Sequence, residues 1–430
     1  MDHDSGKHLT RRDFMLGVGR FGAAFAAGAA GLPAALGATS NPSEWLKPDK
    51  EEANAGTLHF LAWSGYDASN VTGPFTKKWN VPIDVSTITS DPAAFNQLKG
   101  GKNAYYDLTS FDMAWVPKLA KAGLVKKLEL ENWKGLAWEH YIEQFRLENY
   151  KYAQLNDQWQ FSSDGDLYGL PQRFGVVAAY ANTKRVPKDV WSESYDWVWN
   201  PGTDYNIGLL DRMFWTIQLI MYYANIDPFK VHTDQEIETV RQETIRLFQN
   251  AKALYAHAPE VNTALLHEEI DVCFEGDNFI NGTLRQAGYL QFQTIVPKRA
   301  NPKNPVYPDA RNNAGGTTWV ETEMVIDNPK LHPAAYDYLA YMQQPETSFQ
   351  LSWPDKGPAV LVPHKYAWDH WSKHQREVLE ADYMQDLMDR CRWYAGIPDL
   401  DKFNDIWEEA KQHIGEKHKE ARRYVKSGYA

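Results

Sequence analysis

The pattern of apolar and polar residues becomes regular near residue 57. Leu58, Phe60 and Ala62 alternate with their neighbours as in a strand, and the apolar spacing over 71–79 fits a short helix. The same reasoning predicts strands over 82–88 and 106–111, and helices over 91–98 and 113–124. This βαβαβ order predicts a parallel sheet covered by helices, with ligands bound beyond the carboxyl ends of the strands.

A second α/β unit is predicted from residue 168 onward. Strand patterns occupy 168–170 and 176–181, and 211–224 is apolar for three helical turns. Thr233 and Glu236 predict a capping box at the start of another helix. Later strands are expected over 272–274, 291–296 and 319–326, a surface loop over 297–313, and a helix over 333–342. Two apolar helix faces complete the pattern: Ile237, Val240, Leu247, Ala251 and Leu254, and, near the C-terminus, Phe403, Trp407, Ala410 and Ile414.

The first 38 residues have the layout of an export signal. Lys7, Arg11 and Arg12 precede an uncharged run rich in Ala and Gly over 21–38. The arginine pair, followed two residues later by Phe14, resembles the bacterial twin-arginine signal. We therefore predict an export signal over 1–38 and a linker over 39–56, with an uncleaved membrane anchor as the alternative.

Composition narrows the possible partners. The 430 residues exceed one average domain, and 45 Lys and Arg against 56 Asp and Glu give a net charge of −11. Such an acidic chain is not expected to bind nucleic acid. The two cysteines, Cys273 and Cys391, are too few for a disulfide framework, and they are predicted as buried thiols or, alternatively, as one disulfide.

Enzyme and metal motifs are largely missing from the sequence. There is no G-x-S-x-G, no P-loop and no H-E-x-x-H. His370 and His374, four residues apart, with His364 nearby, could suggest a metal site, but a solvated helix face beside Asp369, Lys373 and Glu377 is the favoured interpretation. We predict no metal, cofactor or catalytic residue. An exported carbohydrate-active enzyme that uses the carboxylates of 268–277 is the alternative function.

Aromatic and acidic residues recur together at the ends of the predicted strands. Rings that face an ammonium group and a carboxylate that accepts its hydrogen bonds would together suit a small cationic ligand. Core packing is the alternative for each ring taken alone. The four groups are Trp63, Tyr66 and Asp67; Asp112 and Trp115; Phe274, Glu275 and Asp277; and Trp319, Glu321 and Glu323.

Seven segments, taken in order, resemble the spermidine/putrescine-binding proteins of bacterial ABC importers. The resemblance extends over about residues 57–365 and rests on the order of the segments, since none of them is decisive alone. The segments are 58–66 (LHFLAWSGY), 106–108 (YDL), 122–128 (AGLVKKL), 168–171 (YGLP), 274–276 (FEG), 285–288 (RQAG) and 316–321 (GTTWVE).

The resemblance implies a two-lobed periplasmic-binding-protein fold of type II, each lobe a mixed, mostly parallel sheet with flanking helices. It implies lobe 1 from 57–172 with 320–366, and lobe 2 from 173–319 with 367–430 including the C-terminal helices. The function implied is capture of a polyamine-like or other amine-bearing solute between the lobes, by a periplasmic monomer that delivers it to permease subunits. The ligand-binding residues implied or suspected are Trp63, Tyr66, Asp112, Arg212, Trp215, Phe274, Trp319 and Glu321.

Two arginines depart from the pattern of a polyamine site. Where the family carries two acids, this chain has Arg212 and Trp215, and Arg173 lies close to the crossover. A desolvated, unpaired guanidinium would repel a polycation. Either Arg212 pairs with Asp211 or Asp204, or the ligand is a zwitterion with an anionic group. The sequence leaves both open.

Overall fold

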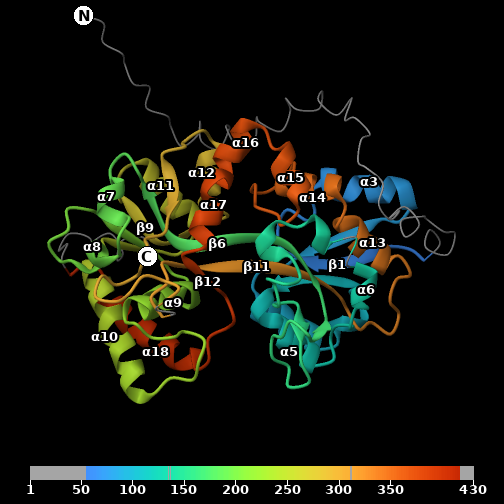
Figure 1. Ribbon diagram of the computed structural model, residues 1–430, viewed down its shortest axis with the longest axis horizontal. Coiled ribbons are helices and arrows are strands. Elements are labelled where there is room, and N and C mark those ends of the chain that lie inside the picture. Colours follow the sequence, from blue (N-terminus) through green and yellow to red (C-terminus); the bar gives the residue numbers. More distant parts are fainter. Residues whose placement is uncertain (1–54, 134, 136, 310–311, 417–430) are drawn as a thin grey trace, which may run out of the picture.

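The computed structural model describes residues 55–133, 135, 137–309 and 312–416 (Figure 1). The predicted export signal and nearly all of the predicted linker lie outside these residues. Within them, ten strands form one mixed sheet in the order β2-β1-β3-β11-β6-β9-β7-β8, with β10 beside β6 and β12 beside β11. The strands are β1 (Leu58–Ala62), β2 (Ile83–Thr87), β3 (Leu108–Asp112), β6 (Leu170–Asn182), β7 (Ile207–Leu210), β8 (Ala253–Tyr255), β9 (Val272–Asp277), β10 (Phe292–Ile295), β11 (Gly316–Val325) and β12 (Cys391–Trp393), and β4 (Gln154–Leu155) pairs separately with β5 (Asp166–Leu167).

Two long antiparallel strands, β6 and β11, cross the middle of the molecule (Figure 1). On one side they meet the parallel group β1, β2 and β3, and on the other the parallel group β7, β8 and β9. Every residue of β6 and β11 is buried. The mixed α/β architecture is as predicted. The predicted lobe boundaries at 172/173 and 319/320 fall inside these two strands, and the lobe division itself stays a prediction.

Helices cover the sheet at both ends, and their starts follow local sequence. The predicted capping box is confirmed: the Thr233 hydroxyl accepts from the Glu236 N–H, and the Glu236 carboxylate accepts from the Thr233 N–H. The helices are α3 (Ser69–Trp79), α4 (Asp91–Lys99), α5 (Val116–Lys121), α6 (Leu130–Trp133), α7 (Lys188–Trp191), α8 (Asp196–Trp199), α9 (Met213–Tyr223), α10 (Asp234–Asn250), α11 (Ala258–Leu266), α12 (Gly282–Gln286), α13 (Ala335–Met342), α14 (Pro345–Ser352), α15 (Lys365–His370), α16 (Lys373–Val378), α17 (Ala381–Met388) and α18 (Leu400–Ala410).

Three predicted elements differ from the structure. The two strands expected over 168–170 and 176–181 are largely one strand, β6. The helix expected to include Leu254 ends at Asn250, and Leu254 lies in β8. The helix expected over 113–124 begins as a 3₁₀ turn at Met113–Trp115, continues as α5, and is followed by Gly123 at φ 66°. That positive φ is the conformation in which a glycine terminates a helix.

Separate apolar clusters stabilise the two ends of the sheet. Beside β1, the ring of Phe75 stacks on Trp79 with centroids 4.3 Å apart. Beside β7 and β9, Trp407 of α18 meets Phe248 edge to face at 4.7 Å. Phe403 and Ala410 are buried in that second cluster as predicted, whereas Ile414 follows the end of α18. Cys273 and Cys391 are both buried free thiols.

Candidate solute-binding site

A row of charged side chains crosses the three central strands. Glu321 of β11 is the register partner of Asp112 on β3 and of Arg173 on β6. Because directly paired residues project to the same face of a sheet, these three side chains lie side by side. Trp319, two residues from Glu321, pairs with Gly175 on the same face. The fold therefore gathers predicted site residues that are far apart in sequence.

Arg173 and Glu321 form a buried, two-pronged ion pair. The Arg173 Nε donates to Glu321 Oε2 at 2.7 Å and its Nη2 donates to Oε1 at 2.9 Å. The Arg173 side chain is 0% exposed and that of Glu321 is 7% exposed. Both carboxylate oxygens of Glu321 are thus occupied and its charge is neutralised. Glu321 positions Arg173 in this structure, rather than offering a free carboxylate to an amine.

Arg173 also holds the turn that follows β1. Its Nη1 donates to the Ser64 carbonyl at 2.8 Å, and its guanidinium lies 4.3 Å from the ring centroid of Tyr66. Tyr66 is fully buried, so its ring supports the guanidinium. Trp63, at the start of this turn, is only partly buried. The Trp63 to Tyr66 turn and Glu321 are therefore joined through a single arginine.

Asp112 and Asp91 form a second pair of carboxyl groups at the end of β3. The Asp112 N–H donates to Asp91 Oδ1 at 3.4 Å, and the Ala114 N–H donates to Asp112 Oδ1 at 3.4 Å. Burial is the main cause that raises the pKa of each group, and the charge of Glu321 adds to it. For Asp112, the charge of Asp91 is a further cause. A carboxyl group in such surroundings retains its proton to an unusually high pH.

Arg212 lies against two buried acids of β9. Its Nη1 is 3.4 Å from Glu275 Oε1 and 3.8 Å from Asp277 Oδ2. Burial raises the pKa of Glu275 to about 8, while the Arg212 charge opposes the shift. The alternative in which Arg212 pairs with Asp211 or Asp204 is wrong in its partners, because Arg212 pairs with Glu275 and Asp277. Asp211 instead contacts Lys411 at 2.9 Å and accepts from the Trp407 indole. Arg212 is nevertheless compensated by acids.

The predicted aromatic residues have different surroundings. Trp215 lies 4.8 Å from the ring of Tyr394, which is itself near Asp112 and Asp91, as their effect on its pKa indicates. The Trp319 indole lies over Gly175 and faces Phe279 at 6.0 Å. By contrast, Phe274 is fully buried in the core, with its ring 5.1 Å from those of both Tyr195 and Trp199. Phe274 is therefore not part of the candidate site.

Two relevant residues were missed from the sequence. Asp91 was recognised only as the start of a helix, although it also follows a strand, as the other site acids do. Tyr394 follows the short strand β12 and gave no sequence signal at all. Arg173 was singled out, but its partner was not. Only the register between β6 and β11 reveals the contact with Glu321.

The carboxylates considered for the alternative enzyme have structural partners. Asp271 is buried and pairs with Arg185 at 2.5 Å, and Glu268 lies 3.6 Å from the same arginine. His370 ends α15 and His374 lies in α16, so they are not on one helix. Across the described part of the chain, no three His, Cys, Asp or Glu side chains are grouped as metal ligands would be.

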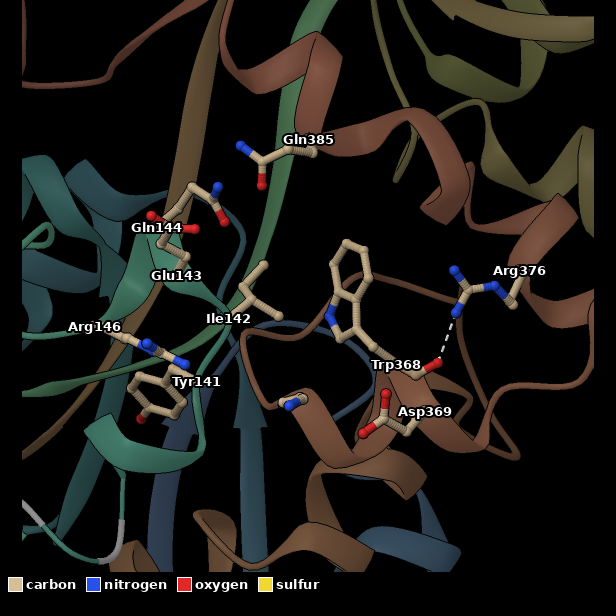
Figure 2. Close-up of a pocket in the computed structure, with 10 residues that line it drawn as sticks. Tyr141, Ile142, Glu143, Gln144, Arg146, Trp368, Asp369, Arg376 and Gln385 are labelled. Carbon is tan, nitrogen blue, oxygen red and sulfur yellow. Dashed lines mark hydrogen bonds between the residues drawn. The ribbon is translucent and has the colours of Figure 1, made fainter.

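A separate cavity of about 360 Å³ opens on the other face of β6 (Figure 2). Phe174, whose side chain points away from that of Arg173, stacks toward Trp368 at 6.4 Å, and Trp368 lines this cavity. The indole of Trp368 faces Ile142 across the opening, and Arg376 donates to the Trp368 carbonyl at 2.7 Å (Figure 2). This cavity does not contain the charged row.

Comparisons with known proteins agree on one relationship. The spermidine/putrescine-binding periplasmic protein 1 of Haemophilus influenzae is 22% identical over 353 residues, covering 81% of this chain and 86% of that protein. The spermidine/putrescine-binding periplasmic protein of Escherichia coli K12 is 24% identical over 307 residues, covering 69% of this chain and 75% of that protein. The chain is a homologue of the bacterial spermidine/putrescine-binding periplasmic proteins. No protein-family model matches it.

The fold of this homologue is that of a substrate-binding protein of an ABC transporter. The crystal structure of PotD from Streptococcus pneumoniae superposes with a TM-score of 0.62 at 15% identity, covering 83% of this chain and 99% of that chain. The predicted periplasmic-binding-protein fold is confirmed. These relatives are solute-binding proteins and lend no support to the enzyme alternative. In the ranges that the structure describes, no helix is both long and apolar enough to span a bilayer.

Proposed function

We propose that this protein is the periplasmic solute-binding component of an ABC importer and that it captures a small, amine-bearing cation between its two lobes. The observation that carries this proposal is the relationship to spermidine/putrescine-binding proteins, which extends over most of both chains. The fold adds support, because the central strands β6 and β11 are the elements on which two lobes would hinge. Delivery of the solute to permease subunits follows from the same relationship.

The sign of the ligand charge follows from how the charges pair. Arg173 is neutralised by Glu321, and Arg212 faces two acids. Neither guanidinium is therefore available to an anionic group without losing an existing partner. The carboxyl groups of Asp91 and Asp112 have no basic partner of this kind. This arrangement favours a cation over the zwitterion that the arginines alone had suggested.

Ligand capture by lobe closure requires contacts from both lobes. A ligand shifts the open and closed populations only by its differential affinity for them. We assign contacts from lobe 1 (57–172 with 320–366) to Trp63 and Asp112. Trp215 and Trp319 supply rings from lobe 2 (173–319 with 367–430). Supporting roles fall to Tyr66 and Glu321, which hold Arg173, and to Arg212, which holds the acids of β9.

A thermal-shift screen tests the proposed function. Polyamines, amino acids and phosphonates would each be added to the purified mature protein, since a ligand at 100 times its Kd stabilises the folded state by about 2.7 kcal/mol. We expect amines to raise the Tm and the other two classes to leave it unchanged. Recovery of the amine unaltered after incubation separates binding from catalysis. A screen in which only phosphonates or amino acids raise the Tm would refute the cation proposal.

The export route and oligomeric state belong to the same proposal. We assign residues 1–38 as a twin-arginine-type signal and the mature protein as a periplasmic monomer. Replacing Arg11 and Arg12 with lysine should leave the folded precursor in the cytoplasm, and fractionation of cells would detect it. Size-exclusion chromatography with light scattering should give the mass of one chain. Normal export of the lysine variant would contradict the twin-arginine assignment.

A further inference from the structure

Asp112 is buried and Asp91 is partly buried, and neither has a basic counterion of the kind that Glu321, Glu275 and Asp277 possess. Glu323 of β11 also lacks a counterion, but it is 0% exposed and therefore out of reach of a ligand. Among described residues, neither carboxyl group forms an ion pair, whereas Glu321, the register partner of Asp112 on the neighbouring strand, is paired with Arg173. Lys118, whose charge lowers the pKa of Asp91, is exposed, and its Nζ lies 4.1 Å over the Trp115 ring. Because an uncompensated buried charge is costly, such a carboxyl group holds a proton until a cationic partner arrives.

Tyr394 brings an unused hydroxyl group to the same place. The residue is 7% exposed, and within the described chain its hydroxyl has no hydrogen-bond partner. Burial raises the pKa of Tyr394, and the charges of Asp112 and Asp91 raise it further, so both carboxyl groups lie in its neighbourhood. The following segment packs close by, since a Cβ on Gly396 would lie 3.7 Å from the Cβ of Ala114. A hydroxyl group that is not engaged by the protein can donate to or accept from a ligand.

Aromatic rings complete the surroundings of this position. Trp215 lies 4.8 Å from the Tyr394 ring, and Trp115 immediately follows the turn that Asp112 caps. An ammonium group offers three N–H donors and a positive charge. It would satisfy two carboxylates and one hydroxyl together, with rings providing further stabilisation. Neither an anion nor a neutral sugar would supply the missing charge.

We propose that Asp91, Asp112 and Tyr394 form a subsite that holds one ammonium group of the ligand. This inference rests on the proposed function and identifies the residues that recognise the amine. It gives the amine-binding role to Asp91 and Asp112 in place of Glu321. It also assigns the hydroxyl of Tyr394, from the C-terminal part of the chain, to the same ammonium group as two acids of lobe 1.

Proton release on binding is a distinctive consequence of this subsite. Burial favours a protonated carboxyl in the ligand-free pair, and the charges facing it are Glu321, Lys118 and the Arg173 that neutralises Glu321. An arriving ammonium group favours the ionised form, so the pair should lose a proton as the amine binds. Amine affinity should therefore rise with pH until the pair is ionised without ligand.

Isothermal titration with three four-carbon probes tests the subsite. Putrescine, n-butylamine and 4-aminobutyrate share a chain and differ only at the far end, and each carries at least one ammonium group that could occupy the subsite. Titrations in phosphate and in Tris near neutral pH, whose ionisation enthalpies differ, report the number of protons released. We expect putrescine and butylamine to bind the wild-type protein with proton release. In D91N and D112N we expect putrescine affinity to fall more than tenfold and the proton release to be reduced.

Two further variants sharpen the test. Tyr394→Phe removes only the hydroxyl and should weaken putrescine binding threefold to tenfold. Asp84→Asn on the outer strand β2 changes an exposed carboxylate that contacts His59 and should leave affinity unchanged. Circular dichroism and the Tm identify any variant that fails to fold, and Tyr394→Phe tests the subsite even if one aspartate variant does.

The outcomes separate this inference from the proposed function. If the wild-type protein binds putrescine and both D91N and Y394F bind it equally well with the same proton release, the subsite is wrong and the solute-binding function stands. If none of the amine probes binds the wild-type protein, while another solute class raises its Tm, the amine part of the proposed function fails and the subsite fails with it.

Discussion

The buried pair of Arg173 and Glu321 makes a sharp prediction about stability. Glu321→Gln keeps the shape of the side chain but removes the charge and turns one acceptor into an amide donor facing the guanidinium. Two hydrogen bonds, at 2.7 and 2.9 Å, would be lost or weakened. Arg173, with 0% of its side chain exposed, would keep only the Ser64 carbonyl and the Tyr66 ring. Removing one partner of a buried pair costs about 3–5 kcal/mol.

Urea unfolding followed by far-ultraviolet circular dichroism measures this loss. Arg173→Gln should cost a similar amount, because it leaves the Glu321 carboxylate buried without a partner. The double variant R173Q/E321Q leaves no unpaired charge and should cost less than the sum of the two by at least about 2 kcal/mol. Glu193→Gln, which breaks the exposed pair with Lys298, is the matched control and should cost less than about 1 kcal/mol.

The same variant separates two roles for Glu321. If Glu321 positions Arg173, the Glu321→Gln variant is less stable than the wild type, and any loss of amine affinity occurs together with this loss of stability. If Glu321 instead anchors the amine directly, affinity falls more than tenfold, since a charge-assisted hydrogen bond contributes about 1.5–3 kcal/mol, while stability stays near that of the wild type. Unfolding free energies within about 1 kcal/mol of wild type for both single variants would refute the positioning role.

Three further changes test other parts of the site. The pKa of Glu275 is about 8 in the folded protein and ordinarily near 4.3, so the folded state holds an extra proton and the unfolding free energy falls as the pH rises from 5 to 8. Glu275→Gln should remove up to about 3–5 kcal/mol of that fall, and an unchanged pH dependence in urea unfolding would contradict this. Gly175→Ala places a Cβ 2.7 Å from the Trp319 indole and 2.5 Å from Asn278 Oδ1, so we expect the unfolding free energy to fall by about 1–3 kcal/mol. Putrescine binding should weaken more than threefold, and unchanged affinity would remove Trp319 from the site. Phe274→Leu should lower the unfolding free energy by about 1–2 kcal/mol but leave putrescine affinity within twofold of the wild-type value. A large loss of affinity in calorimetry would return Phe274 to the site.

Elements with strong local signals could be predicted from the sequence. The capping box of α10 and the buried face of α18 depend on residues within a few turns of one another, and both were found. β6 was divided into two because the chain is buried on both faces there, so it lacks the alternation of a half-exposed strand. Leu254 was misplaced because its spacing continues the helical period beyond Asn250.

The site could be predicted only in part, because strand register is not a local property. Glu321 and Arg173 are 148 residues apart, and only the pairing of β11 with β6 brings them together. One error was avoidable. Phe274 and Glu275 are consecutive on a strand and must point to opposite faces, so both cannot line one cleft. Had that alternation been applied, only one of the two residues would have been kept in the cleft, and the structure shows that Phe274 is the one in the core.

Arginines are compatible with the proposed cation-binding site when each of them is paired with carboxylates of the protein. Burying an unpaired guanidinium costs several kcal/mol, so Arg173 and Arg212 need carboxylates from neighbouring strands, and the structure supplies them. An arginine found where relatives carry an acid therefore does not by itself imply an anionic ligand. The charge that selects the ligand is the one left over after this pairing. Glu323 also remains unpaired but is 0% exposed, so on our proposal the selecting charge is that of Asp91 and Asp112, for which a bound ammonium group would be the missing partner.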